Sequence, residues 1–378
     1  MFKILILAFV ACAGATDFRK MFSEAMEKYR DQAGISETEP TARTKKRFEA
    51  FVKFAKLTAA INANKKFTFK SVNNFLSILT DEEKQSRLGL NQTGQLSSSM
   101  YEQPALTSNL QAARSRDFSS KISPVKDQGG CGSCWTFSAT AALEGEIYFT
   151  TGKQGTSLSE QEYVDCSTTS NGCNGGWMGD CYDYSKNKGR IAPNSAYPYK
   201  ERDAMYCDTW GKANALTQTN VKVTGTIYIK GDSNLLQYAD KHIVSVAIAV
   251  VDSFYGYSTG VYNEWNCPSP NHAVAVVGFG SDYWLVRNSW GQAWGARGHI
   301  KMSRNVNNIC GISGSANIPR VECANNSCRS PDIGAGGEEF DAGGDNSGGG
   351  SGGCNADAGL VYCYDCYCCK HIHMCNDY

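Results

Sequence analysis

The cysteines of this chain are distributed unevenly, and their positions divide it into segments of different chemistry. One cysteine lies in residues 1–15, none lies in residues 16–112, eight lie in residues 113–321, two lie in residues 322–353, and six lie in residues 354–378. The sixteen cysteines beyond the leader fit an oxidising compartment, in which most cysteines pair as disulfides. The sequence therefore predicts a cysteine-free N-terminal part, a cross-linked middle part and a short cysteine-rich tail.

Residues 1–15 have the pattern of a cleavable signal peptide. Their apolar run, residues 4–10, is too short to cross a bilayer and leads directly into small residues. We therefore expect entry into the secretory pathway, towards a lysosomal or endosomal compartment or the extracellular space, and no membrane span. The sequons at Asn91 and Asn325 predict glycosylation on this route. Lys and Arg number 37, as do Asp and Glu, so no net charge points to nucleic acid as a partner.

Residues 16–112 are polar and carry two sets of apolar residues at helical spacing. The sets are Phe18, Met21, Phe22, Ala25, Met26 and Tyr29, and then Phe48, Phe51, Val52, Ala55 and Ala59. This spacing predicts two amphipathic helices whose apolar faces need a partner. The partner is either the rest of this segment, as in a small helical domain, or another part of the chain.

The residues at the C-terminal end have a different composition. Ten of the 22 residues in 332–353 are glycine, which predicts a flexible linker over residues 322–353. Residues 354–378 are too few to form a core without disulfide cross-links or a bound metal ion. Their six cysteines, with His371 and His373, would form either a disulfide knot or a metal site. The oxidising compartment favours disulfides, so no metal site and no cofactor are predicted.

Residues 113–321 combine helical and strand patterns. Residues 243–251 and 273–279 are nearly continuous apolar runs rich in β-branched side chains, which predicts buried strands. Residues 135–150 are apolar at helical spacing and end at Thr151-Gly152, which predicts a long buried helix.

Cys134 lies where the glycine-rich turn 128–133 meets the start of that helix. The helix dipole and its unpaired amides favour a thiolate at this position, and a thiolate is a nucleophile. Cys131 and Cys134 also form a Cys-x-x-Cys pair, so a redox motif, half of a zinc site and two structural disulfides are alternatives. We see no thioredoxin-like βαβ pattern and no second closely spaced pair in residues 113–321, which favours the nucleophile.

Three histidines lie outside the tail, and we predict that His272 is the general base. It stands at the head of an apolar run that would hold its imidazole rigidly, whereas His242 and His299 lie beside lysines. Asn288 emerges from an apolar strand and would orient the imidazole, which completes a Cys-His-Asn set. The alternatives are a structural histidine and a buried amide that is simply hydrogen bonded.

Four motifs together resemble the papain family of cysteine proteases, nearest its cathepsin L-like branch. They are residues 128–138, Cys173-Asn174-Gly175-Gly176, Asn271-His272-Ala273-Val274 and Asn288-Ser289-Trp290-Gly291. The resemblance implies an α+β, papain-like fold of two domains over residues 113–321. One domain would be helical and the other β-barrel-like, with the active site between them. Residues 16–112 would be an inhibitory propeptide.

The resemblance also implies a role for each residue of the active site. Cys134 would attack the scissile carbonyl, while the Gln128 side chain and the Cys134 backbone N–H would form the oxyanion hole. His272 would protonate the leaving amine. Asn288 would hold the imidazole, and Trp290 would shield that hydrogen bond from water.

The residues implied to bind substrate form a backbone contact and a pocket. Gly175 and Gly176 would line the substrate strand, with Gly176 pairing its backbone to it. The main specificity pocket would consist of Met178, Ala247, Ala273 and Ser315. This pocket is mostly apolar and carries no charge, so we expect a bulky aliphatic or aromatic P2 residue, the second residue before the cleaved bond.

The resemblance pairs the cysteines of the middle part as Cys131–Cys173, Cys166–Cys207 and Cys267–Cys310, with Cys181 left over. The function implied is that of a monomeric cysteine endopeptidase made as a latent precursor. Its partners would be polypeptide substrates, its own propeptide and cystatin-like inhibitors. A non-catalytic binding or matrix protein on the same scaffold, and a peptide ligase using the same acyl-enzyme, are the alternatives.

Overall fold

The computed structural model describes residues 17–91, 115–204, 206–325 and 328. The predicted signal peptide, most of the linker and the cysteine-rich tail therefore lie outside the described residues. The chain divides into two units, residues 1–338 and 339–378, and all described residues belong to the first. None of its described helices is long and apolar enough to cross a membrane.

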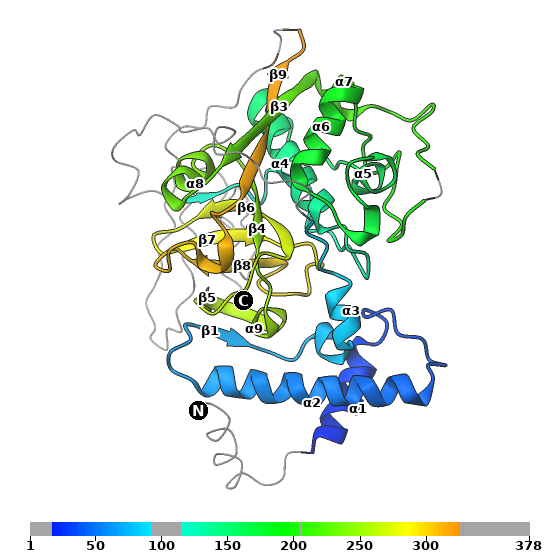
Figure 1. The fold of residues 1–378 in the computed structure, drawn as a ribbon, viewed down its shortest axis with the longest axis vertical. Coiled ribbons are helices and arrows are strands. Elements are labelled where there is room, and N and C mark those ends of the chain that lie inside the picture. The colour runs from blue at the N-terminus through cyan, green and yellow to red at the C-terminus, as the bar shows by residue number, and fades with distance from the viewer. Residues whose placement is uncertain (1–16, 92–114, 205, 326–327, 329–378) are drawn as a thin grey trace, which may run out of the picture. The chain divides into compact units, whose positions relative to one another are not determined.

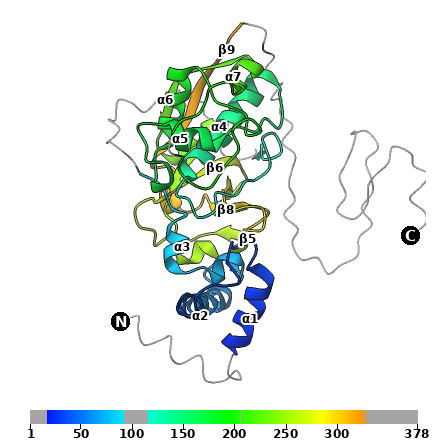
Figure 2. The ribbon, with the colours of Figure 1, turned by 90° about the vertical axis from the view of Figure 1, so that its right-hand side faces the viewer.

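The N-terminal part contains both predicted amphipathic helices. It comprises α1 (Phe18–Tyr29), α2 (Thr41–Ala63), the short strand β1 (Phe69–Ser71), the 3-10 turn η1 (Phe75–Ile78) and α3 (Asp81–Gln85). The two long helices pack through Phe22, whose ring centroid lies 5.5 Å from those of both Phe48 and Phe51. Figure 2 shows these elements at the end of the molecule that carries strand β5.

The apolar face of this part packs against another part of the chain. The segment is therefore not a small helical domain with its own core. Phe51, Phe75 and Phe69 belong to one buried cluster that also contains Phe254 and Trp294 of the β-rich domain. The N-terminal residues therefore do not form an independent core.

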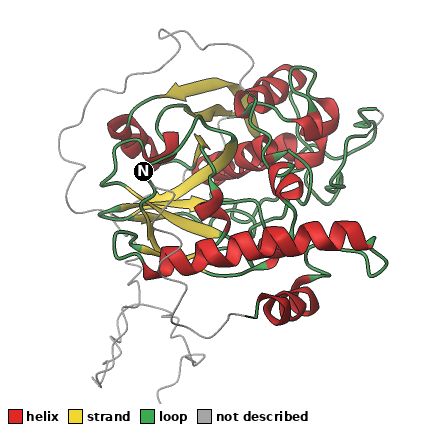
Figure 3. Cartoon of the chain, turned by 60° about the horizontal axis from the view of Figure 1, so that its bottom comes forward, coloured by secondary structure: helices red, strands yellow, loops and turns green. Residues whose placement is uncertain are grey.

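The helical domain lies on one side of the strands (Figures 1 and 3). It contains α4 (Cys134–Thr151), α5 (Glu160–Cys166), η3 (Gly172–Asn174), α6 (Met178–Lys188) and α7 (Ala215–Thr219). Helix α4 is the predicted buried helix, and it ends at Gly152, whose φ of 75° is in the left-handed region that favours glycine. Ser138 on α4 donates a hydrogen bond of 2.7 Å to the Val274 carbonyl, which joins this helix to the sheet.

The β-rich domain contains the remaining strands and short helices. They are β2 (Arg116–Asp117), β3 (Val221–Ile229), α8 (Asp232–Ala239), β4 (Val244–Ile248), α9 (Asp252–Tyr255), β5 (Tyr257–Tyr262), β6 (His272–Phe279), β7 (Tyr283–Arg287), β8 (His299–Ser303), η4 (Ile309–Gly311) and β9 (Ala316–Cys323).

The nine-stranded sheet has the order β1-β5-β8-β7-β6-β4-β9-β3, with β2 on β6. The predicted strand 273–279 is confirmed by β6, and the predicted strand 243–251 is confirmed but shorter, because the chain turns into α9 after β4. Strand β1 of the N-terminal part pairs antiparallel with β5 and so extends the sheet of the β-rich domain.

Four disulfides occur among the described residues. They join Cys131 to Cys173, Cys166 to Cys207, Cys267 to Cys310, and Cys323 to Cys328. The last was not predicted. Cys134 and Cys181 are free and buried, so Cys131 and Cys134 do not form a redox disulfide with each other.

Candidate active site

The predicted nucleophile and the predicted base come from different domains and meet at the interface between them. Cys134 is the first residue of α4, and His272 is the first residue of β6. The Cys134 Sγ accepts a hydrogen bond of 3.4 Å from the backbone N–H of Ala273, the residue that follows His272. Both side chains are fully buried in this structure.

Asn288 fixes the His272 ring. The imidazole Nε2 lies 2.8 Å from the Asn288 Oδ1, and this oxygen also accepts a hydrogen bond of 2.8 Å from the Ser289 N–H. Because the Asn288 Oδ1 is an acceptor, Nε2 is the donor and carries the proton. The Nδ1 is buried and makes no hydrogen bond, so it is the ring nitrogen left to exchange a proton with a neighbouring thiol.

Trp290 covers this pair. Its ring centroid lies 5.0 Å from that of His272, with 32° between the planes, and on another side it stacks on Tyr255 at 5.4 Å. The indole is completely buried. Water therefore has no direct access to the His272–Asn288 hydrogen bond from this side.

The Gln128 side chain is oriented by a residue that sequence reasoning missed. The hydroxyl of Ser289 donates a hydrogen bond of 2.6 Å to the Gln128 Oε1, so the amide nitrogen points the other way. That nitrogen donates to two carbonyls, Cys131 O at 2.8 Å and Arg87 O at 2.9 Å. Ser289 stands within the Asn288-Ser289-Trp290-Gly291 motif, but nothing in the motif indicates that its hydroxyl reaches a residue 161 positions away.

Residues 87–91 of the N-terminal part, here called the crossing segment, run directly over these side chains. Gly176 donates to the Gly89 carbonyl at 3.0 Å and accepts from the Asn91 N–H at 3.0 Å, and Leu90 and Gly176 form a parallel bridge. A Cβ on Gly89 would lie 1.7 Å from the Gly132 carbonyl oxygen, so only glycine fits there. The Gly89 amide also points to the Cys134 sulfur.

The residues predicted to bind substrate lie around the crossing segment. Gly175 has a φ of 108°, and a Cβ added to it would lie 2.4 Å from the Asn91 Nδ2. Of the four predicted pocket residues, Met178, Ala247 and Ala273 are buried, and Ser315 is half-buried. Ala247 and Ala273 are opposite each other on β4 and β6, and the Ser315 carbonyl accepts from the Ala247 N–H at 3.2 Å. Leu90 packs against the buried cluster that contains the first three.

Burial dominates the protonation of the site. It raises the pKa of the Cys134 thiol to about 11, although the amides of Ala273 and Gly89 lower it in part. It lowers the pKa of His272 to about 4, against the effect of the Asn288 hydrogen bond. The thiolate expected at the start of α4 is therefore not the state of this covered site, because dehydration outweighs the helix N-terminus. Between these two pKa values the sulfur and the imidazole are both neutral.

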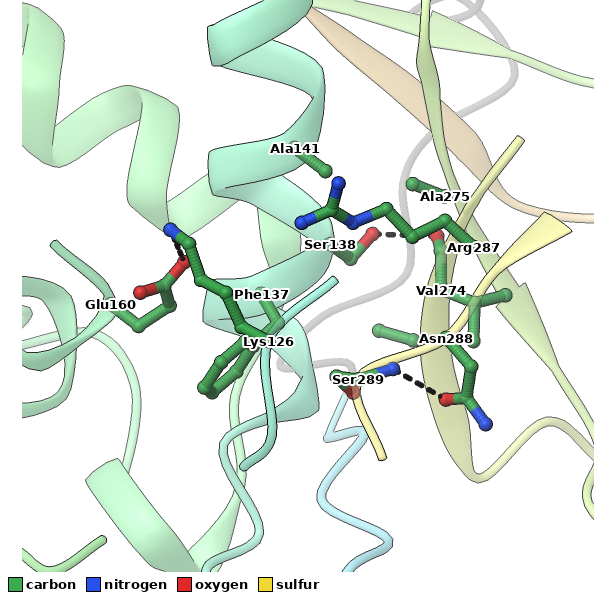
Figure 4. Close-up of a pocket in the computed structure, with 11 residues that line it drawn as sticks. Lys126, Phe137, Ser138, Ala141, Glu160, Val274, Ala275, Arg287, Asn288 and Ser289 are labelled. Atoms are coloured by element: carbon green, nitrogen blue, oxygen red, sulfur yellow. Dashed lines mark hydrogen bonds and ion pairs between the residues drawn. The ribbon is translucent and has the colours of Figure 1, made fainter. Parts of the chain in front are cut away.

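A small cavity lies behind Asn288, between α4 and strands β6 and β7 (Figure 4). Lys126 is held there by Glu160 at 2.7 Å and by Glu144 at 3.1 Å. Arg287, the residue before Asn288, donates a hydrogen bond of 2.7 Å to the Pro124 carbonyl. These ion pairs and this hydrogen bond stabilise the two chain segments that carry Gln128 and Asn288. Among the described residues, no three His, Cys, Asp or Glu side chains gather in a way that would hold a metal ion.

Comparisons with known proteins agree with this architecture. Residues 111–320 match the family described as papain family cysteine protease. The chain is 38% identical over 342 residues to the Cathepsin L-like peptidase of Aedes aegypti, covering 84% of this chain and 99% of that protein. It is 37% identical to Cathepsin L1 of Drosophila melanogaster, covering 84% of this chain and 90% of the relative.

A solved structure, digestive procathepsin L 3 of Tenebrio molitor larval midgut, superposes with a TM-score of 0.67 at 30% identity, covering 81% of this chain and 99% of that one. Fold, site and relatives together define a cysteine peptidase with its propeptide in place. The chain belongs to the papain family of cysteine proteases, in its cathepsin L-like branch. The likeness to procathepsins also supports the N-terminal part as an intramolecular inhibitor.

Proposed function

We propose that this chain is the latent precursor of an endopeptidase that cleaves peptide bonds through an acyl-enzyme on Cys134. After the propeptide leaves, the His272 Nδ1 takes the thiol proton, and the Cys134 sulfur attacks the substrate carbonyl carbon. The oxyanion that forms is held by the Gln128 Nε2–H and the Cys134 backbone N–H. When the intermediate collapses, His272 passes its proton to the departing amine, leaving a thioester.

The second half of the reaction reverses these roles. Water gives a proton to His272 while its oxygen attacks the thioester carbonyl, and the same oxyanion hole holds the new intermediate. Its collapse releases the carboxylic acid and returns the proton to the Cys134 sulfur. Asn288 keeps Nδ1 pointed at the sulfur in both halves, because its Oδ1 holds Nε2 at 2.8 Å.

One contact carries this proposal: the Gln128 Nε2 already donates to a peptide carbonyl, that of Arg87, at 2.9 Å. A backbone carbonyl therefore binds at the position where an oxyanion-hole donor is needed, and the Cys134 sulfur lies two residues further along the crossing segment, at Gly89. The propeptide therefore occupies the amide donor that we expect a substrate oxyanion to use.

A hydrophobic P2 preference follows from the same segment. Leu90 forms the parallel bridge with Gly176 and packs against the cluster of Met178, Ala247 and Ala273. We propose that a leucine-like side chain of the substrate replaces Leu90 there, because the pocket offers apolar surface and the half-buried Ser315 is neutral.

We further propose a monomer of the secretory pathway, lysosomal or exported, that cystatin-like inhibitors recognise. Glycosylation at Asn91 and Asn325 remains a prediction. Asn91 is exposed, and its Nδ2 donates a hydrogen bond of 2.8 Å to the Asn174 carbonyl. Asn325 is also exposed.

The test is hydrolysis of a peptide with leucine at P2 by protein from which the propeptide has been removed. We expect cleavage inside the peptide, release of a free carboxylate, and labelling of Cys134 by a thiol-directed peptide epoxide. The matched variant Cys134→Ala should lose both cleavage and label, whereas Cys181→Ala, which removes the other free thiol of the described residues, should keep them. Cleavage that survives Cys134→Ala would exclude this mechanism.

A further inference from the structure

Asp127 lies beside the oxyanion-hole donor and holds a cation of the propeptide. It directly precedes Gln128, and its Oδ1 accepts a hydrogen bond of 2.9 Å from the Gly129 N–H. The same oxygen lies 3.3 Å from the Arg87 Nη1. The Arg87 side chain is 6% exposed and Asp127 is 41% exposed, so the pair lies at the edge of the covered surface. The Arg87 carbonyl therefore accepts a hydrogen bond from Gln128, while the Arg87 guanidinium forms an ion pair with Asp127.

The position of Arg87 relative to the reacting sulfur identifies the side of the site on which Asp127 lies. Three successive contacts mark the path of the crossing segment. Leu90 forms a bridge with Gly176, and the Gly89 amide points to the Cys134 sulfur. The Arg87 carbonyl accepts a hydrogen bond from the Gln128 side chain. If substrate residues before the cleaved bond bind at Gly176, the residues after it lie on the opposite side of the sulfur. Asp127 is on that second side, where the leaving amine and the residues attached to it would bind.

The local charge is negative once the propeptide has gone. The neighbouring Lys126 is half-buried and already held by Glu144 and Glu160, so it is not directed to Asp127. A second carboxylate, that of Glu201, accepts a hydrogen bond from the Gly130 N–H of the same loop. Glu201 has a φ of 57°, a left-handed backbone conformation that residues other than glycine seldom adopt. Two carboxylates therefore flank residues 129–130.

We infer that Asp127 is a specificity-determining residue that selects a basic side chain, Arg or Lys, at one of the first two positions after the scissile bond. The inference rests on the proposed endopeptidase function. Arg87 shows that a guanidinium reaches this carboxylate when its own backbone lies at the Gln128 donor. The ion pair is partly exposed, so we expect a modest preference, about three- to fivefold in kcat/KM.

The experiment uses the mature enzyme and internally quenched peptides with leucine at P2. Each peptide carries Arg, Gln or Glu at the first or the second position after the cleaved bond. We expect kcat/KM to fall in the order Arg, Gln, Glu, and the Arg-to-Gln ratio to fall to about one in Asp127→Asn. Asparagine keeps the acceptor for the Gly129 N–H, so this variant removes the charge and preserves the turn.

Asp282→Asn is the matched control, because Asp282 lies in the turn at the opposite end of β6 from His272. It should keep the wild-type ratio. Adding salt to the wild-type enzyme should reduce the ratio, which tests the inference even if Asp127→Asn does not fold. Cleavage of all peptides without a basic preference, or a ratio unchanged in folded Asp127→Asn, would overturn this inference alone. No cleavage of any peptide would overturn the proposed function as well.

Discussion

The propeptide contacts the peptidase in two regions that differ in kind. At β5 and α9 the pairing of β1 with β5 is accompanied by a large apolar contact: Phe69 lies 4.7 Å from Tyr262 between ring centroids, and Phe75 is buried in the shared cluster. Over the active site the contact is made mainly by backbone, through Gly89, Leu90 and Asn91, with the Leu90 side chain on the apolar cluster and the Arg87 guanidinium beside Asp127. Apolar burial supplies most of the free energy of association, whereas a backbone contact fixes position. We conclude that the first region holds the propeptide and the second blocks the chemistry.

The largest expected effect is in the apolar region. Phe75→Ala should destabilise the docked propeptide by about 3–5 kcal/mol, because it removes a fully buried ring from the shared cluster. The unprocessed precursor should then cleave peptide and show earlier thermal unfolding. Val72→Ala is the control, since Val72 is exposed in the same stretch, and it should stay latent. A latent, normally stable Phe75→Ala precursor would show that the apolar region does not hold the propeptide.

A smaller effect is expected from the backbone region. Gly89→Ala should displace the crossing segment, because its Cβ would lie 1.7 Å from the Gly132 carbonyl oxygen, and overpacking costs about 1–3 kcal/mol. Unlike Phe75→Ala, it should free the active site while the propeptide stays docked, as judged by co-elution of a pre-cleaved propeptide with the enzyme. Ser86→Ala, an exposed neighbour, should remain latent. Release of the propeptide by Gly89→Ala would contradict the division between the two regions.

The third prediction concerns acid. Arg47 is buried between Glu39, at 2.7 Å, and Glu83 in the N-terminal part. Desolvation raises the pKa of Glu83, but hydrogen bonds from Arg47 and the Thr80 amide outweigh it, and the net pKa is lowered from 4.5. A carboxylate with a lowered pKa stabilises the fold above its unfolded pKa, and that stability is lost as the pH falls through the folded value.

Thermal unfolding of a Cys134→Ala precursor should therefore show the propeptide loosening as the pH falls below 4.5. Glu83→Gln should flatten this dependence at a lower overall stability. The matched variant Glu37→Gln, at an exposed carboxylate 3.6 Å from Arg30, should leave the dependence unchanged. An unchanged pH profile in Glu83→Gln would remove Glu83 from the explanation.

The sequence predicted the parts of the site that depend on short motifs. The local pattern around Cys134, His272 and Asn288 indicates the helix or strand that carries each residue. In the structure His272 lies beside Asn288, and the backbone next to His272 contacts the Cys134 sulfur. The paired helices of the N-terminal part and the helix that ends at Gly152 were predicted for the same reason, because periodicity and a terminal glycine are local signals.

Features that depend on contacts distant in sequence were not predicted. The need for glycine at 89 arises from the Gly132 carbonyl, and the orientation of Gln128 arises from Ser289. The thiolate expected at Cys134 did not take account of the crossing segment, whose contact buries the sulfur and raises the pKa of the thiol in the precursor. The Cys323–Cys328 disulfide was missed because two cysteines five residues apart do not by themselves indicate pairing.

The reactivity of Cys134 before and after removal of the propeptide shows whether the crossing segment shields the sulfur. Alkylation by iodoacetamide, followed by peptide mass, distinguishes this thiol from Cys181. In the precursor, with the thiol pKa near 11 and the His272 pKa near 4, we predict negligible modification of Cys134 from pH 5 to pH 8. The mature enzyme should react rapidly over the same range, and His272→Ala should abolish that difference. Equal rates in precursor and mature enzyme would contradict the claim that the crossing segment covers a neutral, dehydrated sulfur.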